Sequence, residues 1–280
     1  MLPAYSILKK IQQDYFLGLI LFALIIIGFI YLAIEYRPIA SYPTDLIDKF
    51  GLRMKLIPEG EFTMGRLYNF PAEQPIHKVY LSSFYIDVYE VTNIQYKSCV
   101  EAGKCSLPLV EYSYTRPDYF KNPQFDNYPV IYVTWSQAKA FCEWRGARLP
   151  TEAEWEKAAR GVDDRSYSWG NNLDCSKVNY NVCSEDTTEV GSYEQGISPY
   201  GLYDMSGNVW EWVSDWRSET YYEISPYMNP QGPNAEAYKV LRGGSWNGYY
   251  AYLSVTYRGR DNPVNATNDY GFRCARDATP

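Results

Sequence analysis

The sequence predicts an α+β domain with little regular secondary structure, preceded by one N-terminal transmembrane helix. Phe16 to Ile34 is an unbroken stretch without a charge, long enough to cross about 30 Å of hydrocarbon. Downstream, Thr92 and Thr151 each begin a segment with the signature of a capped helix. Beyond Gly161 the chain is dominated by Gly, Asn, Tyr and Trp, so only short strands and loops are expected there.

The apolar run divides the first part of the chain. We expect residues 1–15 to form a cytoplasmic tail, residues 16–36 an anchor in the lipid bilayer, and residues 37–53 a stalk, with one helical turn at Asp45 to Phe50. The folded domain is then residues 54–280.

The alternatives for the apolar run are a cleaved signal peptide or a buried helix. The apolar core of a signal peptide usually has about 7–15 residues and ends at small residues, whereas this run is longer and Ile34-Glu35-Tyr36 is no cleavage site. Lys9 and Lys10 favour a cytoplasmic N-terminus. We therefore expect a single-pass membrane protein whose C-terminal domain is periplasmic or extracellular.

Cysteine usage agrees with an oxidising compartment. The chain has six cysteines, and four of them form two pairs close in sequence, Cys99 with Cys105 and Cys175 with Cys183. None has the Cys-x-x-Cys spacing of a metal site, and His77 is the single histidine, which leaves little for zinc or iron. The alternative is a cytosolic protein with six reduced core cysteines, although the polar loops around Cys105, Cys175 and Cys183 argue against it.

Composition narrows the range of partners. The net charge of −7 and the absence of a basic run make nucleic acid an unlikely ligand. The 29 tyrosines form either a binding surface or, for most of them, a loop-rich core in which their hydroxyls bond to the backbone.

The elements of the domain follow in order. A short strand at Phe62 to Gly65 and two strand pieces within Lys78 to Glu90 precede a helix at Glu90 to Gly103, where Thr92 and Gln95 form a capping box. Ser106 to Asn127 is a long irregular loop.

The best-supported helices come next. Trp135 to Arg145 has apolar residues at helical spacing and ends at Gly146, and a second helix runs from Pro150 to Arg160 with Thr151 and Glu154 as its capping box. The later strands are expected at Asn208 to Trp216, Lys239 to Gly243 and Gly271 to Ala275.

A series of motifs in the later part of the chain resembles the formylglycine-generating enzyme, or sulfatase-modifying factor, family. The motifs appear in the family's order between Ile57 and Arg276, and they include Arg148-Leu149-Pro150-Thr151-Glu152, Gly207-Asn208-Val209-Trp210-Glu211, Arg242-Gly243-Gly244-Ser245-Trp246 and Gly271-Phe272-Arg273-Cys274. The resemblance implies a compact α+β domain related to C-type lectins. It also implies a long-range disulfide between Cys142 and Cys274, which would leave no free thiol.

The enzymes of this family oxidise a substrate cysteine with copper(I) held by two of their own cysteines. The matching positions here are Gly248 and Leu253, so no soft metal site is expected and neither copper nor iron is predicted. A related iron enzyme of the family uses a histidine cluster, which a chain with only His77 cannot supply.

Calcium is the metal that the resemblance does imply. One site would use the side chains of Asp204 and Glu211 and the carbonyls of Gly207 and Val209, and a second would use Asn179, Asp186 and the carbonyl of Tyr180. The alternative is that these acids cap turns and helix ends.

We therefore expect a domain that has lost catalysis and serves in protein binding, or as an accessory or assembly subunit of a larger membrane complex. The candidate binding face comprises Trp210, Ser245, Trp246, Tyr249, Tyr250 and Tyr252. Trp210 and Ser245 match residues that line the family's oxygen pocket, although packing and turn formation are their simpler roles. The rival hypotheses are a metal-dependent oxidase or hydroxylase of the same family, and a membrane-tethered maturation factor.

Overall fold

The computed structural model describes residues 42–67, 70–181 and 183–278. The expected tail and membrane anchor, residues 1–36, lie outside the described residues, as does the first part of the expected stalk. Within the described ranges, no helix combines the length and apolar character that a bilayer-spanning segment needs. The folded unit begins at Pro43.

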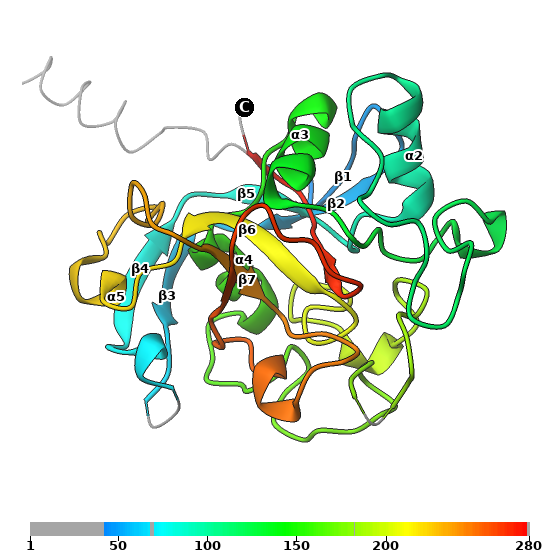
Figure 1. The fold of residues 1–280 in the computed structure, drawn as a ribbon. Coiled ribbons are helices and arrows are strands. Elements are labelled where there is room, and N and C mark those ends of the chain that lie inside the picture. The colour runs from blue at the N-terminus through cyan, green and yellow to red at the C-terminus, as the bar shows by residue number, and fades with distance from the viewer. Residues whose placement is uncertain (1–41, 68–69, 182, 279–280) are drawn as a thin grey trace, which may run out of the picture. The chain divides into compact units, whose positions relative to one another are not determined.

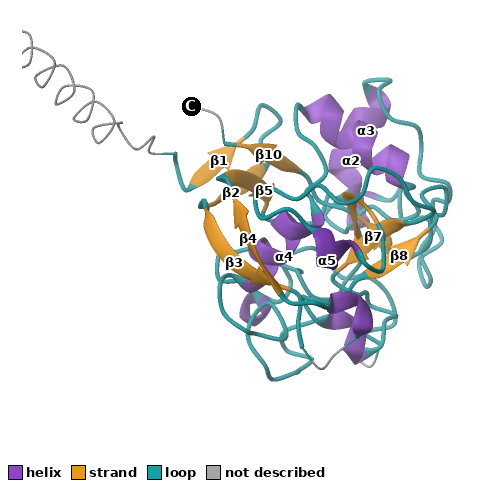
Figure 2. Cartoon of the chain, turned by 90° about the vertical axis from the view of Figure 1, so that its left-hand side faces the viewer, coloured by secondary structure: helices purple, strands orange, loops and turns teal. Residues whose placement is uncertain are grey.

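The domain has a mixed α/β fold built on three small sheets (Figures 1 and 2). The first sheet has the order β1 (Asp45–Ile47), β2 (Arg53–Ile57), β5 (Phe84–Asp87), β10 (Ala275–Asp277). The second sheet pairs β3 (Gly60–Met64) with β4 (His77–Leu81). The third sheet has the order β8 (Gly259–Asp261), β7 (Lys239–Arg242), β6 (Trp210–Trp216), β9 (Tyr270–Gly271). All neighbours are antiparallel except β6 and β9. The pairing of β5 with β10 joins the beginning and the end of the domain.

The helices are few and short. They are α2 (Asn93–Glu101), α3 (Trp135–Arg145), α4 (Glu152–Arg160) and α5 (Tyr221–Ile224), with 3-10 turns at Pro71–Glu73, Pro123–Phe125, Glu194–Gly196 and Tyr250–Leu253. α2 packs beside α3 (Figure 1). The capping box predicted for α4 is present, since the backbone N–H of Thr151 donates to Glu154 Oε2 (2.8 Å) and that of Glu154 donates to Thr151 Oγ1 (3.2 Å).

Two local expectations were wrong. Asp45 to Phe50 does not form a helical turn, because Asp45–Ile47 pairs as β1 with β2 and Lys55 Nζ lies 2.6 Å from Asp45 Oδ1. Gly271 to Ala275 is not one strand either. Between β9 and β10 the backbone leaves its sheet, and Phe272 and Cys274 bond instead to the segment around Asp87 and Val91. The first conformation is decided by the nearby strand β2, and the second by residues far away in sequence.

α4 forms the centre of the core, and every one of its residues is buried. It packs against β3, β4, β6 and β7, with Trp155 fully enclosed. Charged residues survive this burial only when they are paired. Glu156 accepts from Arg242 and Arg160, while Lys157 Nζ donates to the carbonyls of Pro58 and Gly60.

All six cysteines of the chain are paired in the structure. Cys99 bonds to Cys105 and Cys175 to Cys183, which close short local loops. Cys142 of α3 bonds to Cys274 across 132 residues. The last bond ties α3 to the segment that leads into β10, so the stretch from α3 to β9 lies within one covalent loop.

Candidate functional site

The Gly-Gly-Ser turn shapes one side of the candidate site. Gly243 and Gly244 follow β7 with φ of +92° and +75°, which L-residues with a side chain rarely adopt. A Cβ on Gly244 would also lie 2.9 Å from the Tyr252 carbonyl oxygen and 3.0 Å from Leu253 Cδ2. The turn therefore needs glycine, and it brings the chain directly against the 3-10 turn at Tyr250–Leu253.

Gly248 and Leu253, the positions that the sequence resemblance matches to catalytic cysteines, carry no reactive group. Leu253 is fully buried, and its side chain packs against the Gly243-Gly244 turn. Gly248 has no side chain, and its backbone N–H donates to the Ser245 carbonyl in a tight turn (2.9 Å). Positions 248 and 253 therefore offer only backbone atoms and the leucine side chain, and all six cysteines are in disulfides.

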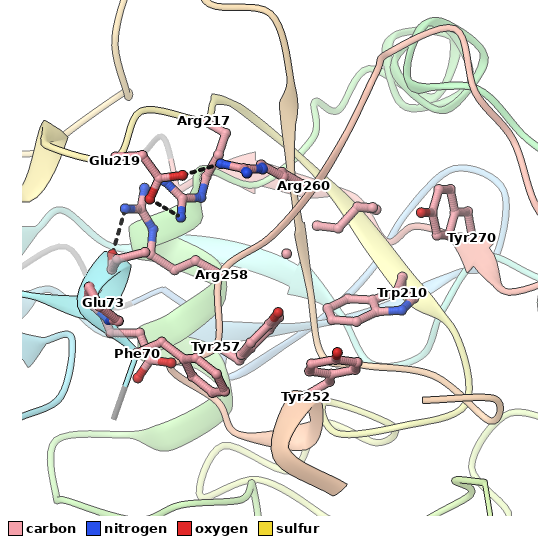
Figure 3. Close-up of a pocket in the computed structure, with 14 residues that line it drawn as sticks. Phe70, Glu73, Trp210, Arg217, Glu219, Tyr252, Tyr257, Arg258, Arg260 and Tyr270 are labelled. Carbon is pink, nitrogen blue, oxygen red and sulfur yellow. Dashed lines mark hydrogen bonds and ion pairs between the residues drawn. The ribbon is translucent and has the colours of Figure 1, made fainter. Parts of the chain in front are cut away.

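A cleft of about 480 Å³ opens beside this turn (Figure 3). We call it the aromatic–arginine cleft, and its lining comprises Phe70, Pro71, Ala72, Glu73, Trp210, Arg217, Glu219, Leu241, Tyr252, Tyr257, Arg258, Gly259, Arg260 and Tyr270. Its volume lies within the range of small-ligand and peptide-anchor pockets.

Aromatic rings form one wall of the cleft. Tyr257 is the central ring, with its centroid 4.8 Å from Tyr252, 4.9 Å from Phe70 and 5.8 Å from Trp210. These edge and tilted contacts are favourable arrangements for aromatic pairs. Gly259 of β8 is required beneath the wall, because a Cβ there would lie 2.8 Å from Trp210 Cζ3.

Three guanidinium groups form the opposite wall (Figure 3). Arg258 is held from behind by Glu152 of α4, through Nε to Oε1 (2.7 Å) and Nη2 to Oε2 (2.8 Å). Its guanidinium also lies over the Tyr222 ring at 3.9 Å. Arg217 Nη2 donates to Glu219 Oε2 (3.2 Å), and Arg260 Nη1 donates to the other oxygen of the same carboxylate.

Electrostatics fixes the charge state of this wall. Burial alone would raise the pKa of Glu152, but Arg258 and Arg242 hold that pKa below its ordinary value. Burial and the neighbouring Arg258 lower the pKa of Arg217. The wall is thus a set of permanently charged groups, of which Arg217 is the least well compensated.

The structure separates the six residues predicted as a binding face. Trp210 and Tyr252 line the cleft. Ser245 is fully buried and donates through Oγ to Asp269 Oδ2 (2.8 Å), while Trp246 is 4% exposed and packs on Tyr114. Tyr249 and Tyr250 are 65% and 58% exposed, and neither belongs to the cleft lining.

Sequence reasoning missed most of the cleft. The cleft combines Phe70, Arg217 and a third segment with Tyr257, Arg258 and Arg260 at the start of β8, and none of these residues belongs to a motif with a recognisable spacing. The only available signal was the exceptional number of aromatic residues, which does not indicate where they gather. His77 contributes nothing to the cleft lining, since it lies on β4 with its ring 4.7 Å from Tyr222.

The first expected calcium site lies among buried acids. Asp204 and Glu211 neighbour Glu90, and Arg273 donates to both oxygens of Glu211 (2.7 and 2.8 Å). Burial raises the pKa of Asp204 to about 6, and burial together with Asp204 and Glu211 raises that of Glu90 well above its ordinary value. Three buried carboxylates facing one guanidinium would be relieved of repulsion by a further cation.

The second expected site is already rich in donors. Asp186 Oδ2 accepts from Ser113 Oγ (2.6 Å) and from both the N–H (2.8 Å) and the Oγ1 (2.7 Å) of Thr115, and Arg116 lies 3.2 Å away. Asn179 Oδ1, by contrast, is buried and has no partner among the described residues. Across those residues, no group of three or more His, Cys, Asp or Glu side chains is arranged to hold a metal ion.

Comparison with known proteins places this architecture in a family. The model of the family described as the sulfatase-modifying factor enzyme 1-like domain matches residues 49–278, a range that contains every element from β2 to β10. The chain belongs to this family. The sulfatase-modifying factor fold therefore explains the low content of regular structure and the order of the motifs.

Relatives of the chain carry different names. It is 42% identical over 237 residues to the serine/threonine-protein kinase pkn1 of Chlamydia pneumoniae, covering 80% of this chain and 38% of that protein. The chain thus spans about two fifths of the length of that relative. It is also 35% identical over 277 residues to the formylglycine-generating enzyme of Streptomyces coelicolor, covering 79% of this chain and 88% of the enzyme.

Solved structures agree with the fold. PvdO from Pseudomonas aeruginosa superposes with a TM-score of 0.72 at 26% identity, covering 85% of this chain and 100% of that chain. Treponema denticola variable protein 1 gives a TM-score of 0.70 at 27% identity, covering 84% and 99%. Because one sulfatase-modifying factor fold serves proteins of different names, the activity of each member has to be argued from its own site.

Proposed function

We propose that this protein is a membrane-anchored, extracytoplasmic and non-catalytic sulfatase-modifying-factor-like domain that binds a protein partner through the aromatic–arginine cleft. The observation that carries the proposal is the chemistry at Gly248 and Leu253. A copper(I) site of the family's kind needs two thiolates. These positions supply a hydrogen and a buried isobutyl group, and every cysteine of the chain is in a disulfide.

The cleft favours binding as the remaining role. Interfaces obtain most of their affinity from aromatic and arginine side chains in concave, partly desolvated places. The cleft presents Trp210, Tyr252 and Tyr257 on one side and Arg217 and Arg260 on the other. Pre-packed rings lose little conformational entropy when a ligand binds. A short segment of a partner protein, with an apolar and a polar group side by side, suits this lining.

The proposed location rests on the N-terminal sequence and the disulfides. Phe16 to Ile34 would hold the domain at a bilayer, with residues 1–15 in the cytoplasm. Disulfides persist in oxidising compartments, which supports a periplasmic or extracellular domain. An accessory or assembly subunit of a membrane complex combines the anchor with the binding cleft.

We propose calcium at the first of the two candidate sites only. Asp204, Glu211 and the carbonyls of Gly207 and Val209 would hold the ion, and its charge would offset the buried acids there. At the second site the Asp186 carboxylate already accepts from hydroxyl, amide and guanidinium donors, and the buried Asn179 Oδ1, which has no partner among the described residues, is left as a single open ligand. The calcium would stabilise the fold and takes no part in a reaction.

The test is purification of the tagged full chain in mild detergent from the cells that produce it, with elemental analysis of the same sample. We expect about one calcium per chain, no copper or iron, and a partner in fixed ratio. Copper or iron together with oxidation of a cysteine-containing peptide would establish the oxidase hypothesis instead. A partner recovered only in traces would favour the maturation factor.

A matched pair of variants ties the partner to the cleft. Tyr252→Ala removes a ring from the cleft wall, whereas Tyr250→Ala removes an exposed ring from the same 3-10 turn outside it. We expect the first variant to lose the partner and the second to keep it, while thermal unfolding shows that both variants are folded at the assay temperature. Equal retention by both variants would show that the partner binds elsewhere.

A further inference from the structure

Two guanidinium groups of the arginine wall, Arg217 and Arg260, share one carboxylate. Arg258 is matched by Glu152, which binds it in a bidentate pair from α4. Glu73 is fully buried, and its Oε2 accepts from Thr256 Oγ1 (2.8 Å). Arg217 and Arg260 are left to share the single carboxylate of Glu219.

Arg217 is also incompletely hydrogen-bonded. Its guanidinium donates through Nη1 to the Ser218 carbonyl (2.6 Å) and through Nη2 to Glu219, but its Nε has no partner among the described residues. The residue is only 6% exposed. A buried unsatisfied donor is costly, and an anion reaching this group relieves that cost.

The Glu219 carboxylate is an example of the kind of group that Arg217 and Arg260 bind. It bridges two guanidinium groups, one oxygen to each, while its side chain remains 58% exposed. An exposed side chain on the loop between β6 and α5 can move aside at little cost. The chain's own glutamate therefore occupies the place of a ligand carboxylate and competes with it.

We propose that the Arg217–Arg260 pair is a subsite for a carboxylate of the bound partner segment, next to the aromatic wall that takes its apolar neighbour. The inference rests on the proposed function and names the class of segment: an acidic residue, aspartate or glutamate, followed by an aromatic one. Charge complementarity selects it, because a lysine or arginine in the same place would face two guanidinium groups of the same charge.

The probe is the tetrapeptide Ac-Gly-Asp-Tyr-Gly-amide, compared with versions that carry Asn or Lys in place of Asp, titrated calorimetrically into the full chain in detergent. We expect the Asp peptide to bind at least fivefold more tightly than the Asn peptide, and the Lys peptide to bind least. Raising the salt concentration should narrow the difference, since the pair lies at the solvent-exposed mouth.

Two surface substitutions predict opposite effects. Arg260→Gln should abolish the preference for Asp over Asn, measured as the ratio of the two affinities in the same variant. Glu219→Gln should increase the affinity for the Asp peptide severalfold, because the internal competitor is gone. Glu101→Gln at the end of α2 changes the net charge equally and serves as the control, with no effect expected.

Each outcome is decisive. If Arg260→Gln keeps the preference, or if Glu219→Gln behaves like Glu101→Gln, the carboxylate subsite is refuted. If all three peptides bind equally to the wild type, a peptide-binding cleft remains but its acidic preference is refuted. If no peptide binds, the inference fails, while the Tyr252→Ala and Tyr250→Ala comparison still decides the proposed function independently.

Discussion

The disulfide between Cys142 and Cys274 should contribute far more to stability than the one between Cys99 and Cys105. Both pairs are expected from the sequence, and both involve buried sulfur, with Cys142, Cys274 and Cys99 fully enclosed. The loops that they close differ greatly, with sequence separations of 132 and 6. The perturbation is therefore a pair of double variants, Cys142→Ala with Cys274→Ala and Cys99→Ala with Cys105→Ala.

The magnitude follows from the chain entropy of the unfolded state. With the loop lengths above, the cross-link restricts the unfolded chain by about 5 kcal/mol for the long loop and by about 2 kcal/mol for the short one. Loss of sulfur packing is similar in the two variants and largely cancels. The free energy of unfolding should thus differ by about 3 kcal/mol between them.

Urea unfolding followed by tryptophan fluorescence measures this difference in the full chain. All 8 tryptophans lie beyond residue 134, so the signal reports on the folded domain and not on the N-terminal segment. At a slope of about 3 kcal/mol per molar urea, the two midpoints should lie about 1 M apart. Equal midpoints would refute the loop-entropy argument and would mean that the unfolded chain is already restricted between α3 and β10.

Three further predictions concern buried groups of the core and site. Burial and the nearby Glu152 raise the pKa of Asp215 from 3.8 to about 7. The contribution of Asp215 to stability is therefore present below about pH 4 and is lost as the pH rises to 7. Urea unfolding should show a loss of unfolding free energy on the order of 3 kcal/mol between pH 5 and pH 8, and Asp215→Asn should remove this pH dependence. Gly207→Ala should lower the free energy of unfolding by about 2–5 kcal/mol, measured with urea, because the φ of Gly207 is +88° and a Cβ would lie 2.3 Å from the Asn179 carbonyl oxygen. Gly103→Ala is the control: its φ is +67° but the space around it is open, so the loss should be only about 1–2 kcal/mol. The double variant Gly248→Cys, Leu253→Cys should bind copper(I), whereas the wild type and either single variant should not. Chelator competition under mild reduction measures this binding. If the double variant does not bind copper(I), the two positions do not face one another.

The sequence by itself determined the features that depend on local chemistry. The α3 and α4 helices are specified by Thr134 and Thr151 with their capping partners and by the glycines that follow each helix. The two short disulfides follow from neighbouring cysteines, and the ordered motifs identified the family and, through it, the bond from Cys142 to Cys274. The sequence alone also shows that positions 248 and 253 are glycine and leucine, which carry no sulfur.

Tertiary structure alone decided the features that depend on distant partners. The charged residues of α4 are all buried, because Glu156 pairs with Arg242 of β7 and Glu152 pairs with Arg258, which precedes β8. The aromatic–arginine cleft brings Phe70, Trp210 and Tyr257 together across nearly two hundred residues of sequence, and no local pattern encodes such a meeting, because it depends on loop paths that packing of the whole domain fixes.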